Sequence, residues 1–366
     1  MPATYGGVEH HVEQIGQRLA QRGHRVIVYS RRSYGELPAV PYLGMDIRLA
    51  PTIASKHLDA IVHSASATVL ALLRRCDVIH YHALGPGLIA PLPRYASRSG
   101  VVLTVHGLDH ERGKWGGAAQ SVLGLAHWMS ARVPNETVVV SRHLGDSYRH
   151  SFDKTVQYIP NGVDQPAPVS PSALAEFGLE PQKYLLFVGR MVPEKAPTAL
   201  LEAYRGLDTQ LKLVLVGDSS FTDAYAEEVR RLAAADPRVI CLGFVHGERL
   251  RALYQYARLF VLPSLLEGLP LTLLEAISHA LPVVASDIPP HREVLGNPDS
   301  AHALFRTGDV ESLRETLAQT LGADLPQAAE LRAFRDSILH HYDWDRATDA
   351  LEQVYLRVAP SPKQEM

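Results

Sequence analysis

Two carboxylates flank the start of an expected helix in the stretch Phe260–Leu295, and their spacing suits recognition of a polyhydroxylated ligand. Glu267 lies in a turn, and Glu275 follows eight positions later, inside a helix expected from Leu271 to about Ala280. The N-terminus of a helix offers unpaired backbone N–H groups and the positive end of the dipole, which suits oxygens or phosphate. Ionised carboxylates only accept hydrogen bonds, whereas sugar hydroxyls can donate them. The alternative is an ordinary solvated charge at each position, and an isolated pair does not decide between the two.

Two cations also stand where they could bind an anion. Arg190 and Lys195 are five residues apart in a loop that directly follows a strand expected over Tyr184–Val188. Arginine contacts phosphate oxygens in pairs and lysine acts as a point charge, so together they suit a diphosphate. Cations near a helix N-terminus oppose the helix dipole, and an anionic ligand would explain their placement. Two solvated surface cations are the alternative.

The elements around these residues read as strand, turn, helix and strand. The apolar run Leu259–Pro263 is short enough to be a buried strand, and Pro282 ends the helix before a second buried strand, Val283–Ser286. This is the right-handed parallel crossover unit of an α/β sheet. In the first half of the chain, a strand is expected over Val101–His106. It places His106 at its carboxyl end, where open α/β sheets bind ligands.

Strands and helices alternate through both halves of the chain, which predicts two α/β domains. We expect the first over residues 1–165 and the second over residues 170–342, with the proline-rich Gln165–Ser172 as the linker. A final amphipathic helix over about 345–358 is expected to pack back on the first domain. Asp343-Trp344-Asp345 mimics a metal-binding Asp-x-Asp, but its place beside that helix favours a helix start.

Composition and charge limit which classes of protein this chain can belong to. The chain has 366 residues, 46% of them hydrophobic and 20% charged, and no apolar run approaches the roughly 18–20 residues that span a bilayer. The first residues do not resemble a signal peptide, and two isolated cysteines, Cys76 and Cys241, indicate a reducing cytoplasm. Residues 1–165 carry a net charge of +5 and the remainder −8. The basic residues are spread out, so nucleic acid is an unsuitable partner.

Seven motifs, in order, resemble a known family. They are YGGVEHHV, TVHGLDHER, VVVSRHL, IPNGVD, FVGRMVPEK, LGFV, and EGLPLTLLEA with VVASDIPPHREVL, and they cover nearly the whole chain. The chain resembles the retaining glycosyltransferases of the GT-B architecture, group 1 or family 4, of the bacterial surface-polysaccharide type. The resemblance implies two Rossmann-like domains facing a cleft. In the family, a strand precedes the Gly-Gly loop. No strand is expected ahead of Gly6 in this sequence. Either the true start of the chain lies upstream, or the first domain lacks that strand.

The resemblance also implies a role for each matching position. Arg190 and Lys195 would bind the donor diphosphate and stabilise the leaving nucleotide, Glu267 would contact the donor sugar, and His106 would lie near the reacting carbon. Donor contacts are further implied for Glu275 at the ribose and for backbone groups at four more places: Gly7, the loop ending at Val245, Gly268-Leu269, and Leu271.

The implied reaction moves a hexose-type sugar from a nucleotide-diphosphate sugar to a glycan or lipid-linked acceptor. A UDP-sugar is favoured over a GDP-sugar, with no further cofactor and no metal. His80 and His82 share one face of a strand, but no third ligand is evident, so they are interpreted as packed or supporting histidines. The basic half suggests an anionic acceptor and peripheral contact with the inner face of the membrane.

Two other classes of function stay open. One is an epimerase or hydrolase acting on a nucleotide sugar, which needs no acceptor surface; the basic first half counts against it. The other is a non-catalytic nucleotide-sugar-binding protein. The joint presence of Arg190, Lys195, Glu267, Glu275 and His106 counts against that reading.

Overall fold

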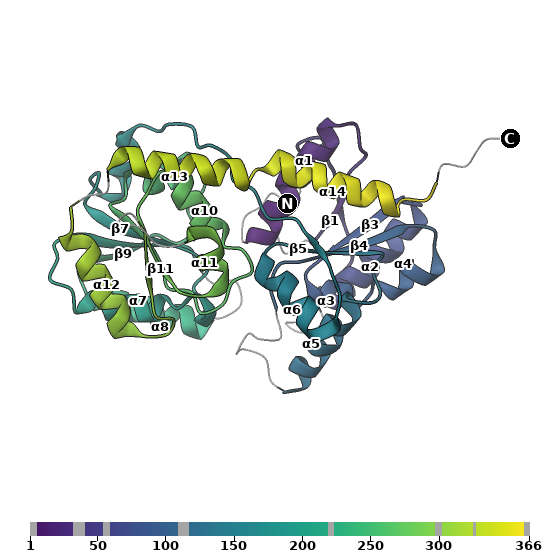
Figure 1. Ribbon diagram of the computed structural model, residues 1–366, viewed down its shortest axis with the longest axis horizontal. Helices are drawn as coiled ribbons and strands as arrows, with labels where there is room; N and C mark the ends of the chain where they lie inside the picture. The colour runs from purple at the N-terminus through teal and green to yellow at the C-terminus, as the bar shows by residue number, and fades with distance from the viewer. Residues whose placement is uncertain are drawn as a thin grey trace. The chain divides into compact units, whose positions relative to one another are not determined.

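The chain forms two α/β units, each described here by itself (Figure 1). Unit 1 comprises Met1–Asn161 and Trp344–Met366, and unit 2 comprises Gly162–Asp343. The computed structural model describes residues 6–31, 41–53, 59–108, 117–218, 223–296, 302–324 and 327–361.

Unit 2 is built on one six-stranded parallel sheet. The strand order is β12-β11-β10-β7-β8-β9, so consecutive strands run outward from β7 on one side and from β10 on the other. This is the doubly wound Rossmann order, and its direction reverses between the neighbours β7 and β10. The strands are β7 (Tyr184–Val188), β8 (Lys212–Val216), β9 (Val239–Cys241), β10 (Leu259–Leu262), β11 (Val283–Ser286) and β12 (His302–Phe305).

The central strands of unit 2 are apolar along their whole length because helices cover both faces of the sheet. Every residue of β7, β10 and β11 is buried. Phe187, Leu215 and Val261 belong to the main core, which helices close (Figure 1). The helices are α7 (Pro197–Arg205), α8 (Asp223–Ala234), α9 (Gly247–Tyr256), α10 (Leu271–Ser278), α11 (Pro289–Leu295), α12 (Val310–Gly322) and α13 (Ala328–His341), with 3-10 turns at Pro171–Phe177 and Pro193–Lys195.

Unit 1 carries two parallel sheets. One pairs β1 (Ile27–Ser30) with β2 (Asp46–Leu49), and the other has the order β3-β4-β5-β6. The latter strands are β3 (Val78–His82), β4 (Gly100–Val105), β5 (Glu136–Val139) and β6 (Gln157–Tyr158). The helices of unit 1 are α1 (Gly7–Gln21), α2 (Asp59–Leu73), α3 (Leu84–Gly87), α4 (Pro91–Ala96), α5 (Gly117–Ser130), α6 (Arg142–Phe152) and α14 (Trp344–Val358).

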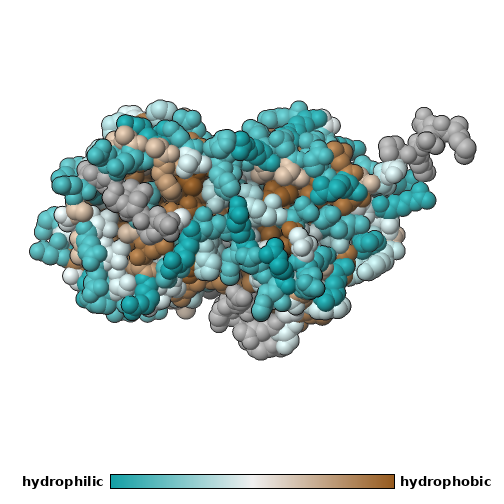
Figure 2. Space-filling model, in the orientation of Figure 1, coloured by the Kyte–Doolittle hydropathy of each residue, from teal (hydrophilic) through white to brown (hydrophobic). Residues whose placement is uncertain are grey.

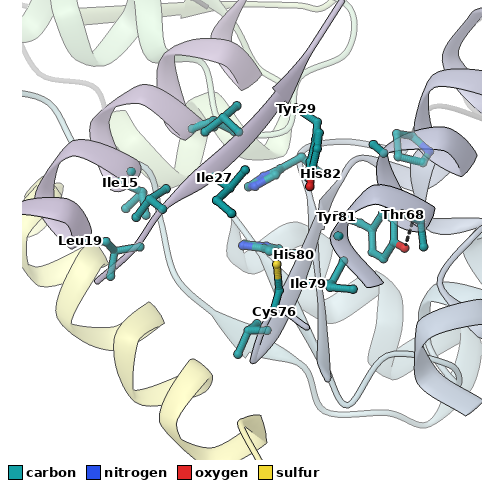
Figure 3. Close-up of a pocket in the computed structure, with 18 of the residues that line it drawn as sticks. Ile15, Leu19, Ile27, Tyr29, Thr68, Cys76, Ile79, His80, Tyr81 and His82 are labelled. Carbon is teal, nitrogen blue, oxygen red and sulfur yellow. Dashed lines mark hydrogen bonds between the residues drawn. The ribbon is translucent and has the colours of Figure 1, made fainter. Parts of the chain in front are cut away.

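A cavity of about 910 Å³ lies between β1 and β3 (Figure 3). Consecutive residues of both strands line it, Ile27–Ser30 on one side and Val78–His82 on the other. Successive side chains of a strand point to opposite faces, so a cavity that meets every residue in turn borders the edge of each strand. Helical residues such as Ile15 of α1 and Thr68 of α2 complete the lining. Among the described residues, β1 and β3 thus each pair on one side, and no strand precedes α1.

Helix α14 belongs to unit 1 although it lies at the far end of the chain. It packs against α1 and β4. Trp344, its first residue, is buried, and Asp345 accepts a hydrogen bond from Arg18 of α1 at 3.0 Å. The interpretation of Asp343-Trp344-Asp345 as a helix start is therefore confirmed.

The predicted fold class is confirmed. The chain after β3 forms two short helices, α3 and α4, because Pro91 starts a new helix as its first residue. None of the described helices combines the length and the apolar character needed to cross a bilayer. The face visible in Figure 2 is mostly hydrophilic, with smaller hydrophobic areas.

Candidate functional site

The loops after β7 and β10 form the centre of the candidate site in unit 2. The two strands are direct neighbours, and ligands of open α/β sheets bind outside the carboxyl ends of strands where the order reverses. The backbone N–H of Leu265 donates to the carbonyl of Glu194 at 2.8 Å, which ties one loop to the other. The sequence-predicted cations and the turn carboxylate are thereby brought into one place.

Lys195 and Glu267 form an ion pair in these loops. The distance from Lys195 Nζ to Glu267 Oε1 is 2.5 Å, and the side chains are only 14% and 9% exposed. Ser264 donates to the same oxygen at 2.7 Å. Burial alone would raise the pKa of Glu267, but the charge of Lys195, the neighbouring His291 and the two hydrogen bonds outweigh it and lower that pKa. Glu267 is therefore a carboxylate at neutral pH, able only to accept hydrogen bonds from a ligand.

His291 was not singled out from the sequence, although it lies in a motif that was quoted. Its ring is fully buried at the start of α11, and Nδ1 lies 2.8 Å from the carbonyl oxygen of Ser286. Nε2 is buried and has no hydrogen-bond partner among the described residues. Burial lowers the pKa of His291 to about 4 against the raising effect of Glu267, so the imidazole is neutral at pH 7.

Arg190 lies in the same loop as Lys195 but reaches toward solvent. Its side chain is 36% exposed, and its nearest described acidic partner is Glu194, at 3.7 Å between Nη2 and Oε1. The backbone just before Arg190 is approached closely by a glycine in the loop after β8. Gly217 has φ +120°, and a Cβ there would lie 2.0 Å from the carbonyl oxygen of Gly189. The backbones after β7 and β8 therefore approach more closely than any side chain would permit.

Glu275 lies one turn into α10, and the start of that helix carries the remaining residues predicted in this part of the chain. Tyr254 donates its hydroxyl proton to Glu275 Oε2 at 2.9 Å, which fixes the carboxylate. Gly268 and Leu269 are buried in the turn, and Leu271 is the first residue of α10. Pro270 precedes the helix and provides no side-chain cap, so backbone N–H groups remain at this end to meet a ligand.

Val245 follows the strand β9 in a neighbouring loop. The backbone N–H of Gly217 donates to the carbonyl of Gly243 at 2.7 Å, so this loop is tied to the loop after β8. Val245 itself is half-buried. The loop lies at the carboxyl ends of the same sheet, as a ligand contact requires.

In unit 1, His106 lies directly after β4 within a cluster of imidazoles. His82 ends the adjacent strand β3, and its Nδ1 lies 3.1 Å from Nε2 of His106. His11 of α1 completes the group, with its ring 4.8 Å from that of His106 between centroids. Burial lowers the pKa of His82 and His106 well below the usual value, and that of His11 to about 4. All three rings are neutral at pH 7.

The other residues noted in unit 1 lie near this cluster or at the start of α1. His80 hydrogen-bonds Tyr355 through Nδ1 and Thr104 through Nε2, which makes it a packed histidine as interpreted. Figure 3 shows His80 and His82 on β3 beside the cavity. Gly7 is the exposed first residue of α1. The meeting of His11, His82 and His106 was not predicted from the sequence. A signal was present, because β3 ends in a histidine and a histidine directly follows the neighbouring strand β4.

Asp109 and His110, which continue the loop after His106, lie outside the described residues.

Comparisons with known proteins agree with this architecture. The model of "Glycosyltransferase Family 4" matches residues 5–165, and the model of "Glycosyl transferases group 1" matches residues 182–323. The chain is 26% identical to the alpha-maltose-1-phosphate synthase of Mycolicibacterium smegmatis over 98% of its own length and 97% of that protein.

Solved structures share the fold. A sucrose-phosphate synthase from Thermosynechococcus elongatus has a TM-score of 0.82 at 18% identity, covering 97% of this chain and 96% of that one. Anabaena HepE, solved in complex with UDP and glucose, has a TM-score of 0.80 at 17% identity, covering 98% and 97%.

Two family models thus account for the two units in the order in which they occur, and each sheet carries its candidate residues at the carboxyl ends of parallel strands. The chain belongs to the GT-B glycosyltransferases, with a family 4 domain followed by a group 1 domain, and it is an enzyme that uses nucleotide-sugar donors.

Proposed function

We propose that this enzyme transfers a hexose-type sugar, with retention of configuration, from a nucleotide-diphosphate sugar to a glycan or lipid-linked acceptor. UDP is the favoured nucleotide. The observation that carries the proposal is the group of charges at the reversal point of the unit 2 sheet: Arg190, and the pair formed by Lys195 and Glu267. Positive charge and carboxylate stand side by side there, as a donor with phosphates and sugar hydroxyls requires.

Each charged group has a role in this proposal. Arg190 and Lys195 bind the diphosphate and stabilise the charge that develops on the leaving nucleotide, which is the largest available contribution to lowering the barrier. Glu267 accepts hydrogen bonds from the donor sugar, and Glu275, held by Tyr254, accepts them from the ribose. Backbone groups at Gly268, Leu269 and Leu271, together with those at Val245 and Gly7, supply the remaining donor contacts.

The proposed reaction needs no covalent enzyme intermediate. The bond between the sugar's anomeric carbon and the phosphate oxygen breaks through an oxocarbenium-like state, and the acceptor oxygen bonds to the same face. The departing phosphate takes the acceptor's proton, so configuration is retained without a carboxylate nucleophile of the kind used by retaining hydrolases. His106 orients hydroxyl groups near the reacting carbon. No metal takes part in these steps.

The charge of the first 165 residues supports an anionic acceptor, such as a lipid-linked sugar diphosphate at the inner face of the membrane. That region carries a net charge of +5, and attraction between it and an anionic surface would weaken as salt rises. Binding to anionic vesicles that does not change with ionic strength would contradict this part of the proposal.

The test of donor binding is a calorimetric titration of the full chain with UDP and with GDP in magnesium-free buffer. We expect UDP to bind more tightly than GDP, and Arg190→Ala to weaken UDP binding at least about tenfold, because a charge-assisted contact with phosphate is lost. Arg306→Ala is the matched control: this arginine is exposed, pairs with Asp309 at 2.9 Å, and lies outside the loops of the site.

Two results would contradict the proposal. One is equal UDP affinity in Arg190→Ala and Arg306→Ala. The other comes from the product: nuclear magnetic resonance of the transferred sugar should give the same anomeric configuration as the donor, and inversion would exclude the proposed mechanism.

A further inference from the structure

Three imidazoles converge in unit 1 from three different elements. His11 comes from α1, His82 from the end of β3, and His106 from the residue after β4. One ring nitrogen of each lies within 4.8 Å of those of the other two. The closest pair, His82 Nδ1 and His106 Nε2, is 3.1 Å apart.

The hydrogen bonding of His11 leaves one of its ring nitrogens without a proton. Its Nδ1 lies 2.8 Å from Oδ1 of Asn161, and an amide oxygen only accepts, so Nδ1 carries the hydrogen. Nε2 is then an unprotonated lone pair. It is buried and has no hydrogen-bond partner among the described residues, and the whole residue is only 2% exposed. A buried acceptor of this kind is unfavourable unless something occupies it.

We propose that Nε2 of His11, Nδ1 of His82 and Nε2 of His106 bind one divalent transition-metal ion of the zinc type. Three imidazole nitrogens suit zinc, cobalt, nickel or copper, whereas magnesium and calcium prefer oxygen ligands. Zinc bound by three histidines keeps a fourth position for water or another ligand.

The surroundings match what such an ion requires. Zinc–nitrogen bonds of about 2.0–2.1 Å require the three nitrogens to lie closer together than their present upper separation of 4.8 Å, so the rings move inward slightly on binding. Asn161 orients His11 in the way that outer groups orient metal-bound histidines.

His80 is close to the site but is not part of it. Its ring lies 4.1 Å from that of His82 between centroids, yet Nδ1 and Nε2 are both engaged, with Tyr355 and Thr104. The proposed ligand set therefore differs from the His80–His82 pair that the strand alone suggests.

Occupation of this site has a consequence that rests on the proposed function. His106 is the residue proposed to orient hydroxyls at the reacting carbon, and a metal ion would take its Nε2 lone pair. Zinc is expected to inhibit sugar transfer reversibly, and a chelator to restore it. Magnesium should have no such effect.

The direct test measures the metal alone, without nucleotide or sugar. The full chain, free of any affinity tag and stripped of metal, is titrated with cobalt(II), and the visible absorption of the ion is followed. We expect saturation at one ion per chain and displacement by zinc. His11→Gln should weaken cobalt binding at least about 100-fold, while His150→Gln, which removes an exposed histidine of the same unit, should leave it unchanged.

A second variant tests the site without removing a ligand. Asn161→Ala leaves all three imidazoles in place but no longer orients His11, so cobalt affinity should fall about 10- to 100-fold. X-ray absorption of the zinc-loaded wild type should show three imidazole nitrogens at about 2.0–2.1 Å.

The proposal is overturned if His11→Gln, folded by circular dichroism, binds cobalt as the wild type does, or if zinc absorption shows fewer than three imidazoles. Cobalt binding together with no UDP binding would contradict the proposed function alone. UDP binding together with no cobalt binding would contradict the metal site alone.

Discussion

At the scale of single residues, the pair formed by Lys195 and Glu267 governs the charge of the proposed donor site. Each partner is mostly buried, so each depends on the other to offset the loss of hydration. Ser264 adds a hydrogen bond to the carboxylate, and Lys195 adds a full opposite charge close to it. The pair therefore keeps a cation and a carboxylate side by side in a mostly buried place.

Removal of one partner should be more damaging than removal of both. We expect Lys195→Met to lower the free energy of unfolding by about 3–5 kcal/mol, because Glu267 is left buried without its counter-charge. The double variant with Glu267→Gln should recover most of that loss. Urea unfolding measures both, with the exposed Lys183→Met as the control, expected to stay within about 0.5 kcal/mol of wild type. A double variant as unstable as the single one would show that the pair is not coupled.

At the scale of elements, the donor site depends on how closely neighbouring loops approach at the carboxyl end of the unit 2 sheet. The loop after β7 contacts the loop after β10 through Leu265, and the loop after β8 contacts the loop after β9 through Gly217. Gly217 also lies against the carbonyl of Gly189, next to Arg190. A shift of the backbone at Gly217 would therefore also move the backbone at Arg190, which is proposed to bind the donor.

Gly217→Ala should weaken donor binding, whereas Gly178→Ala should not. Both glycines have positive φ, +120° and +60°, so each substitution should cost roughly 1–3 kcal/mol of stability through backbone strain, and Gly217→Ala should lose more stability because its Cβ would overlap a backbone oxygen. Only at Gly217 would the new Cβ meet another backbone atom, since nothing lies within 4 Å at Gly178. UDP titration should therefore show binding weakened at least about tenfold in Gly217→Ala alone, and equal effects of the two variants would contradict this account.

Elements with strong local signals could be predicted from the sequence. The strands β7 and β11 have the expected bounds, and α10 begins at Leu271 as expected. Two of the elements that were not predicted have weak local signals: β6 has only two residues, and α2 is rich in small Ala, Ser and Thr side chains, so its apolar spacing is indistinct.

The site was predictable only in part, because some of its contacts join distant positions. Arg190, Lys195, Glu267 and Glu275 stand out by charge next to expected helix starts, although their roles stay predictions. His11 meets Asn161 across 150 positions of sequence, and no local pattern encodes that contact. Lys195 and Glu267 are 72 positions apart, and their direct pairing follows from the adjacency of β7 and β10.

At the scale of the whole molecule, buried neutral histidines make stability depend on pH. Burial lowers the pKa of His11, His80, His82 and His106 in unit 1 and of His279 and His291 in unit 2, with values of about 4 for His11, His279 and His291. The folded state therefore binds fewer protons than the unfolded state once the pH falls below about 6.5. The stability that neutral imidazoles contribute is complete above that pH and is lost progressively as the pH falls through about 4.

Urea unfolding at several pH values checks this dependence. The free energy of unfolding should fall steadily from pH 7 to pH 5, and His291→Gln should reduce the slope because one titrating group is removed. Lowering of the Glu267 pKa adds a further loss at more acidic pH, in the same direction. A stability that is flat between pH 7 and pH 5 would contradict the prediction.

The cavity between β1 and β3 separates the two parallel sheets of unit 1, and this affects the stability of the smaller sheet. Strand β4 has a ladder on each side, with β3 and with β5, and all of its residues are buried. Among the described residues, strand β1 has a ladder only with β2, and the cavity separates it from β3. Opening of β1 and β2 breaks no ladder of the larger sheet, so we expect their backbone hydrogens to exchange faster than those of β4.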